Sequence, residues 1–361
     1  MPFQIIQNDI TKVSADAIVN TANPQPVIGG GTDSAIYHAA GEAQLLEERR
    51  KIGSIQPGNA VSTPAFSLKA RYIIHTVGPV WIDGNHSERE ILHSCYANSL
   101  KLAAELSCKS IAFPLIATGV YEFPKDEALD TALKEIGKFL LTHEMNITLV
   151  VFDKKAMELS EKLVGEIDKY IDDHAIETLR EKEYGCFFGS LFQRRRIQKE
   201  LEQIEDYSQA EWDEELTECK NESMPKMAPY KAVSERTESS PLDEVLKKKE
   251  DTFQQRLFKL IDERGLDDVT VYKRANVDRK LFSKIRSRAD YHPKKKTAVA
   301  FAIALKLDMP TMQDLLSRAE FALSPGNKFD LIISYFVNSG NYDIYEINSA
   351  LFKYGQPILG E

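Results

Sequence analysis

The sequence has few of the features that mark exported or membrane proteins. Only four cysteines occur among 361 residues, and they are scattered along the chain. A disulfide framework or a zinc site is therefore not expected, and a reducing cytoplasm fits best. No hydrophobic run approaches the roughly 20 residues that cross a bilayer, and the first residues lack the charged-then-apolar order of a signal peptide. These absences argue against secreted, membrane-embedded and fibrous proteins.

The remaining composition is that of a globular protein, with 43% hydrophobic and 28% charged residues. At roughly 100–200 residues per domain, the length predicts two domains and connecting material. Charge is unevenly distributed: residues 199–238 contain 12 acidic and 5 basic side chains, whereas residues 273–296 contain 10 basic and 2 acidic ones. This pattern predicts an acidic linker followed by a domain with its own electrostatic role.

The first 170 residues alternate between strand-like and helix-like hydrophobic patterns. The predicted strands are Phe3–Gln7, Ala17–Val19, Tyr72–Val77, Ser110–Ile116 and Ile147–Phe152. The predicted helices are Thr32–Arg50, Glu88–Leu106, Lys125–Thr142 and Lys155–Ile171. Strands separated by helices of this length predict an α/β fold with a mostly parallel sheet, whose ligands bind beyond the carboxyl ends of the strands.

The rest of the chain divides into two further segments. Residues 173–240 contain several proline breaks among acidic residues and predict a partly helical, partly disordered linker. Residues 241–361 are helical in pattern throughout. The helices expected there are Thr252–Arg264, Val269–Ala275, Asp278–Arg288, Pro293–Leu307 with proline in its first turn, Thr311–Leu323 and two within Lys328–Tyr354.

Six short motifs fall at the predicted strand ends. They are Asn8-Asp9-Ile10-Thr11, Asn20-Thr21-Ala22-Asn23, Gly29-Gly30-Gly31-Thr32-Asp33, His75-Thr76-Val77-Gly78-Pro79, Ile116-Ala117-Thr118-Gly119-Val120-Tyr121 and Val151-Phe152-Asp153. In this order they closely resemble a macrodomain of the MacroD-like branch, over about residues 1–170. The resemblance implies a three-layer α/β/α sandwich with a mixed, mostly parallel sheet at residues 1–172, and it implies binding of ADP-ribose.

Two glycine-containing loops, Gly29–Gly31 and Thr118–Tyr121, each follow a predicted strand and precede a helix. Backbone N–H groups in such loops can point at a pyrophosphate, and a helix N-terminus adds positive potential. A side chain at these positions would hold the phosphate away from the backbone. Taken singly, either loop also fits an ordinary turn.

The resemblance also assigns individual ligand-binding residues. They are Asp9, Ile10, Asn20, Gly29, Gly30, Gly31, Tyr37, Thr118, Gly119, Val120, Tyr121 and Phe152. In the family, the carboxylate matching Asp9 accepts a hydrogen bond from the adenine amino group, and the aromatic side chain matching Phe152 packs on adenine. Alone, Asp9 would cap a turn and Phe152 would belong to the core, so both alternatives stay open.

Asn23 and Asp33 are the expected catalytic residues. The resemblance places the Asn23 amide beside the distal ribose, where it can donate to and accept from sugar hydroxyls. The matching carboxylate for Asp33 orients or activates water, and the N-terminal end of its helix favours the ionised form. The chain departs from the family pattern at Tyr37, where relatives have histidine, and at Glu122, where they have glycine; both favour binding over turnover.

The implied reaction is hydrolysis of an ester at the distal ribose, with an ADP-ribosylated protein or O-acetyl-ADP-ribose as substrate. No cofactor and no metal are expected, because no cluster of ligating residues has suitable spacing. His75 is expected in a strand-end hydrogen-bond network and His38 on a helix surface. A non-catalytic ADP-ribose sensor and a repressor-like regulator that has lost its ligand are the alternatives.

Residues 269–316 resemble the helix-turn-helix core of lambda-repressor-like proteins. A helix ending at Ala275 precedes a turn at Asn276-Val277, and Asp278 is a plausible N-cap for the next helix. The candidate nucleic-acid contacts on that helix are Arg279, Lys280, Lys284 and Arg286. A solvated basic face or a protein-docking surface remains the alternative reading. DNA or a protein is therefore the expected partner of residues 241–361.

Overall fold

The computed structural model describes residues 2–152, 162–174, 251–288 and 291–360. Residues 175–240 of the predicted linker and the start of the helix expected at Lys155–Ile171 lie outside these residues. Residues 1–173 and 251–361 belong to one compact unit. No helix among the described residues combines the length and hydropathy needed to cross a membrane.

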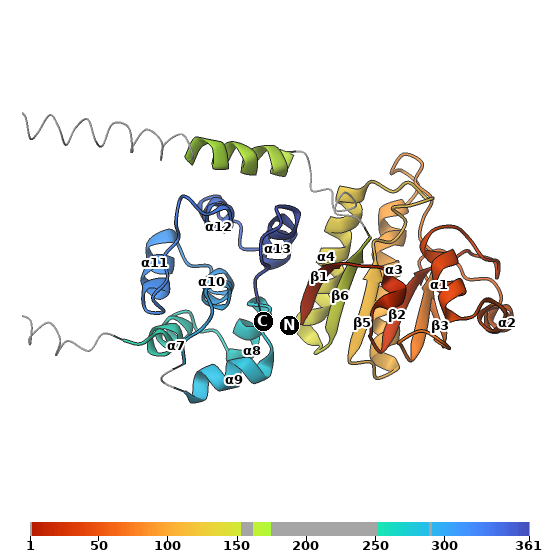
Figure 1. The fold of residues 1–361 in the computed structure, drawn as a ribbon, viewed down its shortest axis with the longest axis horizontal. Helices are drawn as coiled ribbons and strands as arrows, with labels where there is room; N and C mark the ends of the chain where they lie inside the picture. The colour runs from red at the N-terminus through yellow and green to blue at the C-terminus, as the bar shows by residue number, and fades with distance from the viewer. Residues whose placement is uncertain (1, 153–161, 175–250, 289–290, 361) are drawn as a thin grey trace, which may run out of the picture. The chain divides into compact units, whose positions relative to one another are not determined.

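Six strands form one sheet at the N-terminal end of the chain (Figure 1). The strands are β1 (Phe3–Gln7), β2 (Ala17–Thr21), β3 (Ala60–Pro64), β4 (Tyr72–Thr76), β5 (Ser110–Pro114) and β6 (Asn146–Val151). Their order is β1-β6-β5-β2-β4-β3, and every neighbouring pair is parallel except β3 and β4. The predicted mixed, mostly parallel sheet is therefore present.

Side chains of the central strands alternate between two hydrophobic layers. On β2, Ala17 and Val19 belong to one buried cluster, whereas Ile18 between them belongs to the other. This follows from the two-residue period of a strand, whose successive side chains point to opposite faces. A strand buried on both faces is typical of a parallel sheet covered by helices.

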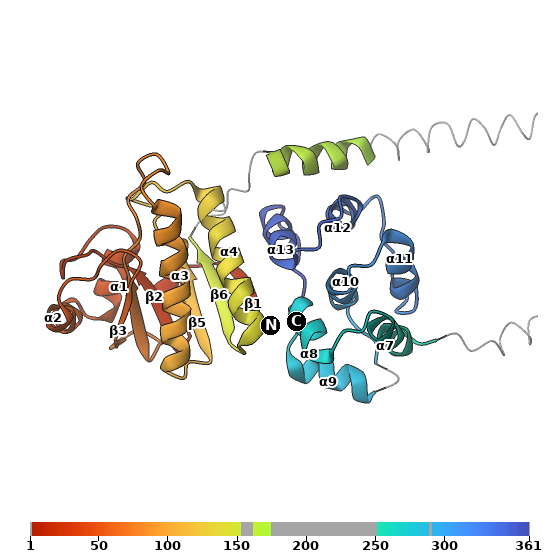
Figure 2. The same cartoon turned by 180° about the vertical axis from the view of Figure 1, so that it is seen from behind.

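Helices cover both faces of this sheet (Figures 1 and 2). The helices are α1 (Thr32–Ala40), α2 (Glu42–Ile52), α3 (Glu88–Glu105) and α4 (Lys125–Thr142). Helices α3 and α4 supply Leu92, Tyr96 and Ile136 to one cluster, while α1 and α2 supply Ile36 and Leu45 to the other. The result is the expected three-layer α/β/α sandwich, with a short 3-10 turn at Ile10–Lys12 after β1.

Two features of this region differ from the prediction. A single helix over Thr32–Arg50 was expected, but Gly41 adopts φ +108° and separates α1 from α2. Because glycine alone enters this backbone region without strain, it ends one helix and begins the next. Strand β3 was not predicted at all, since its half-buried residues Ala60–Ser62 give a weak hydrophobic pattern at the sheet edge.

Residues 251–360 are helical, as expected. The helices are α7 (Phe253–Glu263), α8 (Asp268–Arg274), α9 (Arg279–Ser287), α10 (Lys295–Ala304), α11 (Met309–Ser317), α12 (Lys328–Asn338) and α13 (Ile344–Lys353). Their starts have clear chemical causes: Thr252 forms a capping box with Gln255, and Asp278 accepts the Lys280 N–H. Pro293 precedes the N-cap of α10 instead of standing in its first turn, and α11 ends at Ser317 well before the expected Leu323.

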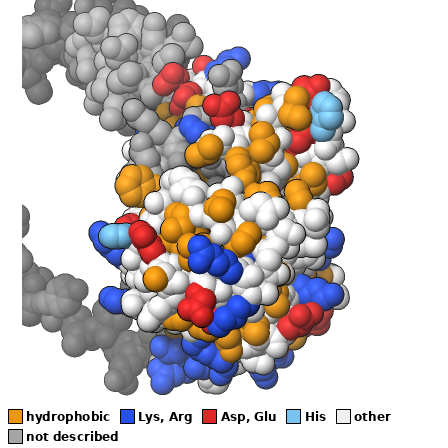
Figure 3. Space-filling view, turned by 90° about the vertical axis from the view of Figure 1, so that its right-hand side faces the viewer, with side chains coloured by type: hydrophobic (Ala, Val, Ile, Leu, Met, Phe, Trp, Pro, Cys, Tyr) orange, Lys and Arg blue, Asp and Glu red, His pale blue; other side chains and the backbone are white. Residues whose placement is uncertain are grey.

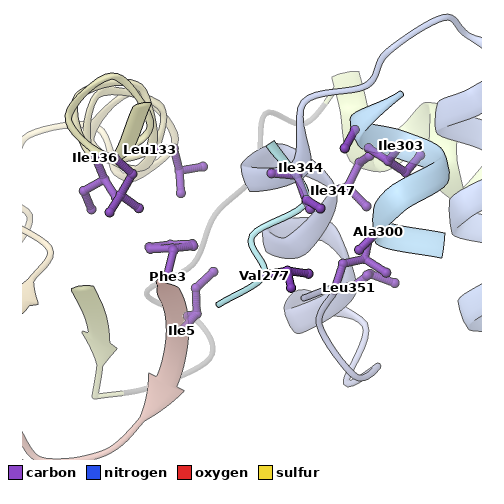
Figure 4. Packing of buried hydrophobic residues seen from close by; sticks show 14 of the residues in the cluster. Phe3, Ile5, Leu133, Ile136, Val277, Ala300, Ile303, Ile344, Ile347 and Leu351 are labelled. Atoms are coloured by element: carbon purple, nitrogen blue, oxygen red, sulfur yellow. The ribbon is translucent and has the colours of Figure 1, made fainter. Parts of the chain in front are cut away.

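The turn between α8 and α9 packs against the free edge of β1. Asn276, which is buried and has φ +52°, accepts a hydrogen bond from the Phe3 N–H and donates to the Phe3 carbonyl oxygen, both at 2.9 Å. One amide thus pairs with the strand edge as a neighbouring strand would. The Phe3 ring meets the Tyr345 ring edge-on at 5.4 Å, and Figure 4 shows the surrounding buried side chains on β1, α4, α10 and α13.

Candidate ADP-ribose site

A cavity of about 410 Å³ lies at the carboxyl ends of β1, β5 and β6. Its lining comes from the segments that follow these strands and from the first turns of α1. The lining residues are Asn8, Asp9, Ile10, Gly31, Thr32, Ala35, Pro114, Leu115, Thr118, Val150, Val151 and Phe152. Five of the sequence-predicted ligand residues are therefore brought together in one cavity, at the sheet edge where ligands of parallel α/β proteins bind.

The two glycine-containing loops approach each other at the mouth of the sheet. A Cβ added at Gly30 would lie 3.7 Å from Cγ2 of Val120, so even an alanine at this position would reach van der Waals contact with the second loop. Gly31 has φ +62°, a value that favours glycine. Glu122 stands where the family pattern has glycine. Its φ of +54° lies in the left-handed region, which non-glycine residues adopt infrequently.

Asp9 and Phe152 stand at the ends of β1 and β6. Asp9 Oδ1 accepts hydrogen bonds from the Thr11 N–H at 2.9 Å and from the Thr11 hydroxyl at 2.7 Å, so this carboxylate does cap the turn. Both bonds lower the pKa of Asp9 and keep it ionised. Phe152 is 82% exposed, which excludes the core alternative and leaves an aromatic face open at the cavity rim.

Asn23, Gly29 and Asp33 form the second half of the site. The Asp33 carboxylate is buried and accepts the Gly29 N–H through Oδ2 at 2.6 Å. Asn23 Nδ2 is 3.4 Å from the carbonyl oxygen of Val27, across the same loop. A Cβ on Gly29 would lie 2.6 Å from Asn23 Nδ2 and 3.1 Å from Asp33 Oδ2, so both predicted catalytic side chains border this one bare position.

A buried chain of polar groups lies behind Asp33. Asn20 Nδ2 donates to Asp33 Oδ1 at 2.6 Å and lies 3.1 Å from Nδ1 of His75. Nε2 of His75 lies 2.9 Å from the Thr63 hydroxyl on β3. His75 thus belongs to the predicted strand-end network, whereas the fully buried Asn20 fixes Asp33 from behind, and its ligand-binding role remains a prediction.

The charge state of Asp33 results from opposing effects. Burial is the largest of them and raises the pKa of Asp33 above its ordinary value, although the Gly29 N–H, the Asn20 amide and the positive charge of Arg49 act in the opposite direction. The ionised form is therefore favoured less than the position at a helix N-terminus alone predicts. Asp33 in turn adds to the effect of burial on Tyr37 and Tyr121, and the pKa of both phenols is raised. His75 stays neutral because burial lowers its pKa to about 3.

Arg49 is the residue of this site that sequence reasoning missed. It stands in the charged stretch Glu47–Lys51, which reads as the solvated face of a helix. In the structure Arg49 is only 1% exposed, because the last turn of α2 directs it under the loop that begins at Asn23. Its spacing of four residues from the buried Leu45 was the available signal.

A third loop borders the site next to Tyr121, whose carbonyl oxygen accepts the Trp81 N–H at 2.9 Å. Within the described residues, Asp83, His86 and Glu88 form the one group whose side chains could share a metal ion. However, the Glu88 carboxylate accepts the N–H groups of the loop itself, and these bonds hold its pKa at about 2 despite the opposing effect of burial. Glu88 therefore organises the loop and carries no case for a metal centre.

Exposed hydrophobic side chains surround the site, and exposed basic side chains lie on α9. Figure 3 shows the face on the side of α2, where hydrophobic side chains lie between charged ones and Lys and Arg gather along the lower edge. Exposed hydrophobic residues occur on all three loops around the site, at Val27, Ile28, Val80, Ile82 and Val120. The candidate nucleic-acid residues of α9 are exposed, but Arg286 pairs with Asp268, and Lys284 lies over the Tyr291 ring.

Known proteins resemble the N-terminal part of the chain. The model of the family described as Macro domain matches residues 19–132. An O-acetyl-ADP-ribose deacetylase of Escherichia fergusonii is 46% identical over 168 residues, which are 45% of this chain and 94% of that protein. The corresponding protein of Escherichia coli K12 is 42% identical over 167 residues, with the same two shares. A Trypanosoma brucei macrodomain solved in complex with ADP-ribose is 35% identical, and the match covers 45% of this chain and 69% of that one with a TM-score of 0.41. Since this chain spans nearly the whole length of its deacetylase relatives, it belongs to the macrodomain family.

Proposed function

We propose that residues 1–172 bind ADP-ribose and hydrolyse an ester at its distal ribose. The observation that carries the proposal is the continuity of the site. The Asp9–Phe152 cavity has the size and open aromatic rim that suit adenosine, and the two glycine loops lead from it to Asn23 and Asp33. The relatives named O-acetyl-ADP-ribose deacetylase support this substrate class.

In the proposed reaction, water attacks the acyl carbonyl carbon of the ester, the bond from acyl carbon to ribose oxygen breaks, and the ribose oxygen leaves with a proton. The products are a free carboxylic acid and ADP-ribose. Asn23 orients the ribose hydroxyls, since an amide both donates and accepts. Asp33 holds the Gly29 N–H and the adjoining loop in place, and its negative charge favours the proton transfer from water.

Binding without turnover is the second candidate function. It is favoured by one observation: each oxygen of Asp33 already accepts a hydrogen bond at 2.6 Å, from Asn20 and from Gly29. A carboxylate held in this way can line a binding site in one fixed orientation without taking part in a reaction. In that case the protein is an ADP-ribose sensor coupled to the helical region, as the departures at Tyr37 and Glu122 also indicate.

The two functions separate in one experiment with the full-length protein. Purified protein is incubated with an acidic protein carrying ADP-ribose on its carboxyl side chains, and in parallel with O-acetyl-ADP-ribose, and the free ADP-ribose released is quantified. Release that is abolished in Asp33→Ala supports the hydrolase. Calorimetric binding of ADP-ribose without release supports the sensor, and the absence of binding heat refutes both.

We propose a targeting or regulatory role for residues 241–361, with DNA or a protein as partner. The exposed basic side chains on α9 support this role, and the helix-turn-helix resemblance favours DNA. The test is binding of the full-length chain to duplex DNA at several salt concentrations. Affinity that falls with salt and weakens in Lys280→Glu and Lys284→Glu supports DNA, whereas equal affinity of the variants and wild type contradicts it.

A further inference from the structure

The proposed reaction needs Asn23 and Asp33 in fixed positions, and the structure contains a buried cation that donates a hydrogen bond to the backbone of Asn23. Among the described residues, Arg49 has the largest of the fully buried side chains, and it comes from the last turn of α2. Burying a guanidinium without a compensating charge or hydrogen bonds is strongly unfavourable. A guanidinium buried at this position therefore needs hydrogen-bond acceptors around it.

The hydrogen bonds of Arg49 hold two backbone segments together. Nη1 donates to the Gly53 carbonyl oxygen at 3.0 Å, at the end of its own helix, and Nη2 donates to the Asn23 carbonyl oxygen at 3.3 Å. The rigid fork of a guanidinium can make both bonds at once, which an ammonium group cannot reproduce with the same geometry. The backbone of Asn23 is thus tied to α2 through Arg49.

The charge of Arg49 acts on the other catalytic candidate. Asp33 faces charged or titratable groups on several elements: Arg49 from α2, Tyr37 from its own helix, Tyr121 from the second glycine loop and, through Asn20, His75 from β4. Of these, Arg49 is the one cation, because His75 is neutral and the two phenols are uncharged at neutral pH. Its positive charge lowers the pKa of Asp33, although less than the hydrogen bonds from Gly29 and Asn20 do.

We propose that Arg49 is a positioning residue for the proposed hydrolysis, which fixes the backbone of Asn23 through the two hydrogen bonds of its guanidinium group. This inference rests on the proposed function for its effect on rate, but its effect on Asp33 exists without any turnover. Two variants separate the two actions. Arg49→Lys keeps the charge and loses the fork, and Arg49→Met loses both.

The first measurement is the carbon-13 NMR titration of the Asp33 side-chain carboxyl, with its signal assigned from its absence in Asp33→Asn. In Arg49→Met the titration midpoint is expected to move up, because the positive charge that favours the ionised carboxylate is removed. In Arg49→Lys it is expected to move less. Equal midpoints in wild type and Arg49→Met overturn the charge role, whether or not the protein hydrolyses esters.

The second measurement is the rate of ester hydrolysis as a function of pH. Arg49→Lys is expected to lower kcat about tenfold with an unchanged KM, since a small displacement of Asn23 affects the reacting end and leaves the adenosine cavity intact. Arg49→Met adds an upward shift of the acidic limb of the profile. If Arg49 had a purely structural role, its variants would contain less folded protein. The pH–rate profile of the folded part would then keep its acidic limb at the wild-type pH.

The matched control is Arg50→Met, which removes a guanidinium from the exposed neighbouring position on α2 and is expected to change neither measurement. If Arg49→Met does not fold, Arg49→Lys still decides: a wild-type kcat in that variant overturns the positioning role. Absence of hydrolysis in the wild type refutes the proposed function alone, because the NMR titration then still tests the charge of Arg49 on Asp33.

Discussion

A single methyl group at Gly29 is expected to disable the proposed chemistry while leaving the fold intact. In Gly29→Ala the new Cβ would lie 2.6 Å from Asn23 Nδ2, whereas ordinary contact of a Cβ begins near 3.4 Å. The amide of Asn23 must therefore retreat by about 0.8 Å, the difference between these two distances. The backbone itself tolerates alanine, since Gly29 is not among the described glycines with positive φ.

A displacement of this size has a known order of effect. A misplacement of about 1 Å at a reacting centre lowers the rate about 100-fold. Overpacking of a tight site also destabilises a protein by about 1–3 kcal/mol. We therefore expect kcat for release of ADP-ribose to fall about 100-fold in Gly29→Ala, with a smaller change in KM, and the urea unfolding midpoint to decrease moderately.

The control is Gly165→Ala in the helix at residues 162–174, where an added Cβ meets no atom within 4 Å. It is expected to stabilise its helix slightly and to leave hydrolysis unchanged. A wild-type kcat in Gly29→Ala would refute the reasoning, because Asn23 would then have no required position next to Gly29. If the protein is a sensor, the loss appears in the calorimetric affinity for ADP-ribose instead.

Three further predictions concern stability. Glu122→Gly relieves a left-handed backbone that costs a non-glycine residue about 1–2 kcal/mol, partly offset by the entropy of glycine, so unfolding in urea should show a gain of up to about 1 kcal/mol; a loss contradicts it. Asn276→Ala leaves the Phe3 N–H and carbonyl oxygen without their partner, at about 1–3 kcal/mol per buried group, and unchanged unfolding in urea contradicts it. His75 has an ordinary pKa of 6.5 in the unfolded chain and a pKa of about 3 in the folded one. Below pH 6.5 the unfolded chain therefore binds one more proton than the folded chain. Lowering the pH from 6.5 to 5 should decrease the free energy of unfolding by about 2 kcal/mol. His75→Asn should flatten that dependence in urea unfolding, and an equally steep profile in the variant contradicts the assignment.

Local pattern was sufficient to predict those elements in which one chemical signal dominates. Helix Lys125–Thr142 has the predicted bounds, because Pro124 ends the preceding extended segment and the buried side chains recur at helical spacing. Asp278 is the N-cap predicted for α9 because a short carboxylate directly before an amphipathic stretch has few other roles. Gly41 was overlooked because the apolar pattern continues across it, and φ is not readable from periodicity.

The candidate site was predictable to the extent that backbone chemistry encodes it. Two glycine-containing loops, each after a strand and before a helix, together indicate an anion site. The cavity at Asp9 and Phe152 forms where the strand ends meet. The groups behind the site could not be predicted in this way. Asn20, His75 and Arg49 belong to three different elements, and only the tertiary fold determines that they converge on Asp33 or its loop.

The junction at Asn276 shows how one residue type can satisfy two patterns. As a turn residue with φ +52°, Asn276 fits the sequence prediction of a break between two helices, since asparagine tolerates the left-handed region better than most residues. As a buried amide, it presents one donor and one acceptor to the edge of β1, which a glycine in the same turn could not do. The amide therefore adds two hydrogen bonds to Phe3 that glycine in the same turn would lack. The same turn residue that predicts a helix-turn-helix core therefore also couples the helical region to the sheet that carries the candidate ADP-ribose site, and any partner that binds α9 approaches a segment already joined to that sheet.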